Sequence, residues 1–201
     1  MKKLIISTAV FVVFFSVWAA KYYSLNNGFH VWHLNPQENY SMHQNIDIGN
    51  NLNYAGEISK GYSVCIEKAY IIDTKKLLSE IGKESNMLDI ADSSIVLDLV
   101  VYNSDSDAGL QLSGMPLIGI DWSVPFSHLT TSYLNESSDS ISQSGYVTVP
   151  KGESISLRVA YDLYKGNYST KSWNSLDEQV IWLGISCRPL DQRIKINLDK
   201  L

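Results

Sequence analysis

The chain has 201 residues, a formal net charge of −5 at pH 7, two cysteines and five tryptophans. Because the charge is negative and the sequence contains no run of Lys or Arg, a nucleic-acid partner is disfavoured. The length is sufficient for one domain with an apolar core.

Residues 4–20 form an almost unbroken apolar run, which follows Lys2 and Lys3. A helix of about 20 apolar residues spans a bilayer, with about 17 as the lower limit, and preceding basic residues favour a cytoplasmic N-terminus. We therefore expect residues 1–24 to anchor the protein in the cell membrane, with the domain outside. The alternative is a cleaved signal peptide, which leaves a secreted protein.

Residues 25–61 are rich in Asn and Gly, and they predict a lead-in loop region with one short strand near residues 46–48. Three histidines and a methionine in this region are candidate ligands for Cu or Zn. Gly28 and Pro36 disfavour the long helix on which histidines three apart would converge. We therefore interpret the four side chains as ordinary loop residues and predict no metal site: His30, His33, Met42 and His43.

The first regular elements follow this region. Residues 62–72 alternate between apolar and polar side chains, with a slip near Lys68 that predicts a β-bulge. Residues 74–81 predict a short helix, for which Asp73 or Thr74 is the candidate N-cap. Residues 94–102 are apolar on both faces apart from Asp98, which is typical of a central strand.

The second half of the chain adds further strands. A strand is predicted near residues 116–120, and residues 145–149 and 154–164 predict a hairpin joined through residues 150–153. Residues 179–187 and 193–198 alternate and predict the last two strands. Many short strands and one small helix favour an all-β fold, an antiparallel β-sandwich over residues 62–201.

Cys65 and Cys187 are the only cysteines. In an oxidising compartment an even pair predicts one disulfide, and the alternative is two buried thiols.

The segment from Asn103 to Gly109 places oxygen-bearing side chains at alternate positions, in the manner of a calcium-binding loop. The glycine that such a loop needs is replaced by Ala108, and Gly114 stands where an acidic residue is expected. We therefore interpret the segment as an acidic turn between strands.

Several aromatic residues are candidates for a partner-binding surface. Trp122 and Phe126 lie close together around a proline, and Trp182 occupies the polar parity of its strand. No motif for a cofactor, a phosphate-binding loop or a serine nucleophile is present. The sequence therefore predicts no cofactor and no catalytic residue.

An N-terminal anchor followed by a late strand ending in Cys187 resembles the sortases, which are anchored cysteine transpeptidases. The resemblance assigns Cys187 as the nucleophile, with His128 and Arg193 as partners. The residues around the sortase histidine and the Thr-x-Thr-Cys pattern are missing. This enzyme is therefore kept only as an alternative.

A second resemblance covers most of residues 62–198. Its features are a strand ending in Asn103-Ser-Asp, the segment Val149-Pro-Lys-Gly-Glu153 before an alternating strand, and Arg188-Pro-Leu190 before the last strand. The chain resembles uncharacterised Ig-like domains on exported proteins of Gram-positive bacteria, and is similar to a mycobacterial secreted antigen. The resemblance implies an Ig-like sandwich and no catalytic residues.

We therefore expect a membrane-anchored or secreted envelope module that binds a protein, a peptide or a wall component without catalysis. The alternatives are the sortase-like enzyme and a structural spacer without a ligand.

Overall fold

The computed structural model describes residues 14–18, 35–53, 59–83, 90–136, 141–142 and 145–199. The chain forms two units, residues 1–36 and residues 37–201. In the first unit, residues 14–18 are helical and exposed. No helix of the described segments is long and apolar enough to cross a membrane. Most of the predicted anchor, residues 4–20, lies outside the described residues, as do His30 and His33.

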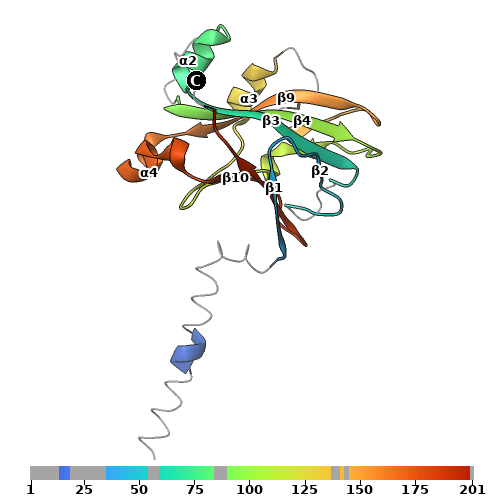
Figure 1. Ribbon diagram of the computed structural model, residues 1–201, viewed down its shortest axis with the longest axis horizontal. Coiled ribbons are helices and arrows are strands. Elements are labelled where there is room, and N and C mark those ends of the chain that lie inside the picture. Colours follow the sequence, from blue (N-terminus) through green and yellow to red (C-terminus); the bar gives the residue numbers. More distant parts are fainter. Residues whose placement is uncertain are drawn as a thin grey trace, which may run out of the picture. The chain divides into compact units, whose positions relative to one another are not determined.

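Residues 37–201 are mostly β-structure and contain two main sheets (Figure 1). The five-stranded sheet has the spatial order β1 (Gln37–Ser41), β11 (Asp191–Ile196), β10 (Ile181–Ser186), β6 (Leu117–Ile118) and β7 (Ser123–Val124). The four-stranded sheet has the order β2 (Ile46–Asp47), β3 (Tyr62–Asp73), β4 (Ser93–Asn103) and β9 (Ser154–Leu163). β1 and β11 are parallel, whereas the other neighbours in these sheets are antiparallel.

One apolar core joins the two sheets. Ile66 and Leu97 of the four-stranded sheet and Leu183 and Ile194 of the five-stranded sheet belong to a single buried cluster. A second, smaller cluster includes Val96, whose neighbours on β4 face the main core. β4 therefore has apolar side chains buried on both of its faces, as its sequence predicts for a central strand.

The described part of residues 37–201 contains three α-helices, whereas the sequence predicts one helix in this region. α2 (Thr74–Glu80) is the predicted helix, and the Asp73 side chain accepts a hydrogen bond from the Lys76 backbone N–H at its start. α3 (His128–Leu134) and α4 (Thr170–Asn174) were not predicted, because each is short and follows a polar segment. Three 3-10 helices complete the described elements: η2 (Leu112–Gly114), η3 (Lys165–Asn167) and η4 (Leu176–Glu178).

The long strands confirm the periodic patterns in the sequence. β3 carries a register shift between Ile66 and Lys68, where the bulge was predicted. The predicted hairpin between residues 145–149 and 154–164 is wrong. β8 (Tyr146–Val147) pairs with β5 (Leu110–Gln111), whereas β9 pairs with β4. A short connection between two strand-like segments therefore does not establish that they pair.

The polar strand β1 lies in the segment predicted to be a loop. All of its residues except Tyr40 are exposed, so its sequence carries no apolar alternation. It forms because its backbone pairs with β11, from Gln37 opposite Asp191 to Ser41 opposite Lys195. The predicted short strand nearby is confirmed as β2.

The outer edge of β9 is covered by α3 and by one side chain that follows it. The Asn135 amide group donates to the Arg158 carbonyl at 2.7 Å, and its oxygen accepts from the Arg158 backbone N–H at 3.1 Å. Ala160 donates to the Thr131 hydroxyl at 2.9 Å and accepts from the Ser127 backbone at 2.8 Å. These contacts satisfy backbone groups that an open edge strand would offer to another chain.

Candidate binding cleft

A cleft lies beside the hairpin of β6 and β7. Its volume is about 540 Å³. One wall is residues 121–127, which run from the hairpin turn to the start of α3, and the other comes from the end of β9 and η3. We call it the Trp122 cleft. The second wall contributes four residues: Asp162, Tyr164, Asn167 and Tyr168.

Local geometry fixes the Trp122 indole at this cleft. The Gly119 backbone N–H donates to the Trp122 carbonyl at 2.9 Å and closes the hairpin turn. A Cβ atom on Gly119 would stand 2.1 Å from the indole ring, so only glycine leaves room for it. The indole N–H donates to the Gln179 side chain at 2.9 Å, and Gln179 in turn donates to the Ser172 carbonyl at 2.9 Å.

Other aromatic rings support the indole. Tyr168 meets Trp122 edge-on at 5.7 Å between ring centroids and contacts Trp173 at 5.5 Å. Phe126 is only 5% exposed and packs edge-on against His128 at 4.7 Å. Trp122 and Tyr168 are half-buried, so each ring is held by the protein and still reaches the cleft.

Two carboxylates line the cleft. Asp162 accepts hydrogen bonds from the hydroxyls of Ser94 at 2.7 Å, Ser127 at 2.5 Å and Thr130 at 2.7 Å. Asp121 is exposed and accepts from the Ser172 hydroxyl at 3.0 Å. In the described part of the chain, no Lys, Arg or His forms an ion pair with either carboxylate.

The pKa of Tyr168 reflects the environment of the cleft. Burial and then the negative charge of Asp121 raise the pKa of Tyr168 to about 12. A phenol resists ionisation when water is excluded from it and a second negative charge is close.

Of the predicted partner surface, the structure brings Trp122 and Phe126 to one cleft. Phe126 forms part of its buried wall. Trp182 does not line the cleft: it is half-buried on β10, opposite Ile118 on one side and Lys195 on the other. Sequence reasoning missed Asp121, Asp162 and Tyr168. Their only signal was an acidic residue beside Trp122 and another on the polar face of an alternating strand.

The predicted disulfide is not formed in the structure. Cys65 alternates along β3 with Val64 and Ile66, which face the core, so its thiol lies on the opposite face of the sheet. The Cys65 thiol donates to Glu67 at 3.1 Å, whereas that of Cys187 donates to the Asn53 carbonyl at 3.5 Å. Burial, followed by the contact with Glu67, raises the pKa of the Cys65 thiol to about 11.

The residues of the sortase-like alternative have separate contacts. The Arg193 guanidinium donates twice to the Asp191 carboxylate, at 2.8 and 2.5 Å. The His128 ring contacts Phe126, and the Cys187 thiol contacts the Asn53 carbonyl. These three contacts are with Phe126, Asp191 and Asn53, and none of them joins one member of the trio to another.

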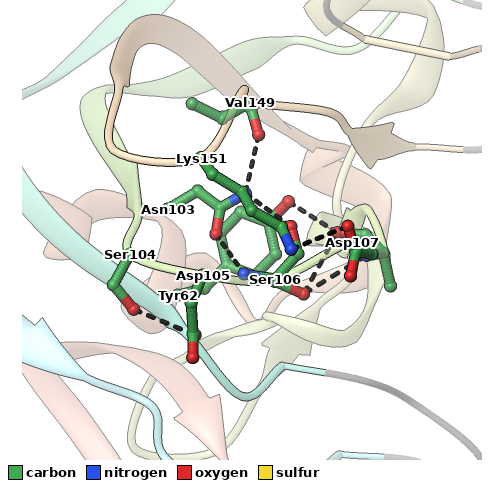
Figure 2. Close-up of polar contacts among 9 residues, drawn as sticks. Tyr62, Asn103, Ser104, Asp105, Ser106, Asp107, Val149 and Lys151 are labelled. Atoms are coloured by element: carbon green, nitrogen blue, oxygen red, sulfur yellow. Dashed lines mark hydrogen bonds and ion pairs between the residues drawn. The ribbon is translucent and has the colours of Figure 1, made fainter.

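Figure 2 shows the turn that resembles a calcium loop. The buried Asn103 amide group donates to the carbonyls of Val149 at 2.7 Å and Ser106 at 2.9 Å, while its oxygen accepts from the Ser106 backbone at 2.7 Å. Lys151 forms an ion pair with Asp107 at 2.8 Å. Asn103 and Asp107, two of the oxygen-bearing residues of the turn, are thus bonded to other groups of the protein.

The candidate metal ligands that the structure describes are also separated. The sulfur of Met42 is buried and accepts from the Asn197 backbone at 3.3 Å. The exposed His43 ring lies 3.6 Å from the Glu67 carboxylate. Among the described residues, no group of three or more His, Cys, Asp or Glu side chains is arranged to hold a metal.

Comparisons with known proteins identify a family. No curated protein matches the chain. One solved structure, described as a "putative lipoprotein from Staphylococcus aureus subsp. aureus NCTC 8325", is 13% identical, has a TM-score of 0.43, and is matched over 72% of this chain and 88% of that one. Residues 37–192, more than half of the chain, match a family model described as a domain of unknown function (DUF5028). The chain therefore belongs to the DUF5028 family.

Proposed function

We propose that the protein is a non-enzymatic envelope module that binds a protein, peptide or wall component through the Trp122 cleft. The observation that carries the proposal is the half-buried Trp122 indole, which lines a cleft and is held in place by Gly119 and Gln179. Aromatic anchors beside a few fixed polar groups are typical of binding sites. Their side chains are already held in position in the unbound protein. A site of this kind loses little entropy on binding.

The covering of β9 supports the cleft over a sheet edge as the binding route. β9 is the longest edge strand described, and Asn135, Thr131 and Ser127 bond to its outer backbone groups at Arg158 and Ala160. A partner that adds a strand there would have to displace these contacts. The other edge strands of the two sheets are shorter: β1 contains five residues, and β2 and β7 contain two each.

We also infer an Ig-like sandwich. The order β3-β4-β9 in one sheet and β11-β10-β6-β7 in the other corresponds to an Ig-type order A-B-E and G-F-C-C′. Proteins with such folds have many different functions, so the fold alone does not indicate the activity of this chain.

The proposal also includes the cellular location of the protein, which we infer from residues 1–24. The apolar run at residues 4–20 anchors the protein in the membrane, or is removed as a signal to release it. N-terminal sequencing of the mature protein distinguishes the two forms. An N-terminus near Ala20 would identify a cleaved signal.

The absence of catalysis is part of the proposal. The Cys187 thiol contacts the Asn53 carbonyl, the His128 ring packs against Phe126, and Arg193 donates to Asp191. A thiolate nucleophile requires a lowered pKa or an adjacent base. Transpeptidation that requires Cys187 would overturn this part.

Site-specific photo-crosslinking in intact cells tests the binding function. A photoreactive side chain replaces Ser123, which is exposed and lines the cleft, or replaces Glu153, which is exposed at the other end of β9. We expect a discrete adduct from position 123 that disappears with the second change Gly119→Val. Equal labelling from positions 123 and 153 would contradict binding at the cleft and would favour the spacer alternative.

A further inference from the structure

The charge and the aromatic lining of the Trp122 cleft indicate a more specific ligand. We propose that the cleft receives the ammonium group of a lysine side chain from a partner polypeptide. This inference rests on the proposed binding function and adds the chemistry of the bound group.

The first argument is charge. Asp121 and Asp162 both line the cleft, and no Lys or Arg is among the lining residues. The hydroxyls that bond to Asp162 orient its carboxylate without neutralising it. In a cleft partly shielded from water, two negative charges without a protein cation attract a positive ligand and repel an anion.

The second argument is the aromatic wall. Trp122, Tyr164 and Tyr168 line the same cleft as the two carboxylates. An ammonium group is attracted to the face of an aromatic ring, most strongly to that of tryptophan. The four-carbon stem of lysine buries apolar surface along such rings while its charged end reaches a carboxylate. One lysine side chain therefore uses both kinds of wall.

A neutral sugar is the main competing ligand. It also stacks on aromatic rings and hydrogen-bonds to carboxylates, but it gains nothing from their charge. Burial first, and then the negative charge of Asp121, raises the pKa of Tyr168, so the Asp121 charge contributes to the electrostatics at the aromatic wall. This favours a cation over a neutral ligand.

Titration of the purified full chain in neutral detergent tests the proposal. The probe is trilysine with blocked ends, and the reporter is the NMR signal of the Trp122 indole N–H, which donates to Gln179. The matched probe is the same peptide with all three side chains acetylated. We expect saturable shifts with trilysine and none with the acetylated peptide.

Two variants locate the charge. Asp121→Asn keeps the size of the side chain and its contact with Ser172, and we expect it to weaken trilysine binding roughly five- to tenfold. Glu153→Gln removes one exposed charge beyond the far end of β9, and we expect less than a twofold change. Both variants should show the melting temperature of the parent chain.

Equal weakening by the two variants, or binding of the acetylated peptide, would overturn the inference. Binding of an N-acetylglucosamine oligomer in place of trilysine would also overturn it, and would assign the cleft to a sugar. If position 123 still crosslinks to a partner in those cases, the proposed function survives without the lysine. If the crosslink is also lost, both proposals fail.

Discussion

The acidic turn at residues 103–109 and the Trp122 cleft contain similar residue types, but their polar side chains have different environments. Both combine Asp and Ser side chains near a tight turn. In the acidic turn the central side chain, Asn103, is fully buried and bonds to Val149 and Ser106. In the cleft, Asp121 stays exposed and no described cation pairs with it. Residue types alone thus do not separate a structural turn from a binding site. The exposure and the bonding partners of each polar side chain do.

The largest expected effect is at the acidic turn. Asn103→Ala removes three hydrogen bonds and takes the side-chain partner from the backbone groups of buried Val149 and half-buried Ser106. We expect a loss of about 3 kcal/mol in the free energy of unfolding, measured by urea denaturation.

Asp107→Ala is the control for this variant. It breaks only the exposed ion pair with Lys151 and should cost less than about 1 kcal/mol. Millimolar calcium should leave the melting temperature of the parent chain unchanged. A calcium-dependent rise that Asp107→Ala abolishes would show that the turn binds the ion.

The next effect is at the cleft. Gly119→Val places a side chain where the Trp122 indole lies, so the ring must move and its bond to Gln179 breaks. We expect about 1–3 kcal/mol of destabilisation and a red shift of tryptophan fluorescence. Gly166→Ala is the matched control, because a Cβ there meets no atom within 4 Å. Unchanged fluorescence in Gly119→Val would refute the packing of the indole on this glycine.

A smaller effect is expected along β9, the strand that runs between the two regions. Asn135→Ala removes both bonds to the Arg158 backbone and uncovers part of the strand edge. We expect a loss of about 1 kcal/mol and greater self-association in sedimentation velocity experiments. Ser132→Ala, on the exposed side of α3, should leave the protein monodisperse to the same degree as the parent. Identical sedimentation of both variants would show that Asn135 does not protect the edge.

The last effect is in the pH dependence of stability and is absent at neutral pH. Folding raises the pKa of Cys65 to about 11 and that of Tyr168 to about 12, above the usual values of 9.0 and 10.0. The folded protein therefore keeps protons that the unfolded chain releases, so stability falls as the pH rises from about 9 towards 12. Tyr168→Phe should lessen the fall between pH 10 and 12, as measured by urea denaturation at each pH. A steeper fall in the variant would reverse the assigned sign.

Long periodic segments made much of the fold predictable. β3, β4, β9, β10 and β11 bury alternate or continuous apolar residues, and this pattern is local. Strand pairing is not local, which is why the hairpin of residues 145–164 was wrong.

β1 escaped prediction because it is polar, and α3 and α4 because they are short. The aromatic members of the cleft were predicted from their clustering, as Trp122 and Phe126. Asp162 and Tyr168 were not, because they reach the cleft from a segment some 40 residues further along the chain. Which acidic residue faces a cleft depends on tertiary contacts, such as those between Asp162 and the hydroxyls of Ser94 and Ser127.

The parallel pairing of β1 with β11 has a mechanical consequence. The first strand of residues 37–201 enters the sheet at Gln37, and the last strand runs beside it in the same direction. Tension that pulls Gln37 away from the far end of β11 acts along both strands in opposite directions. The five paired positions then bear the load together, in shear, and do not open one after another as in a zipper.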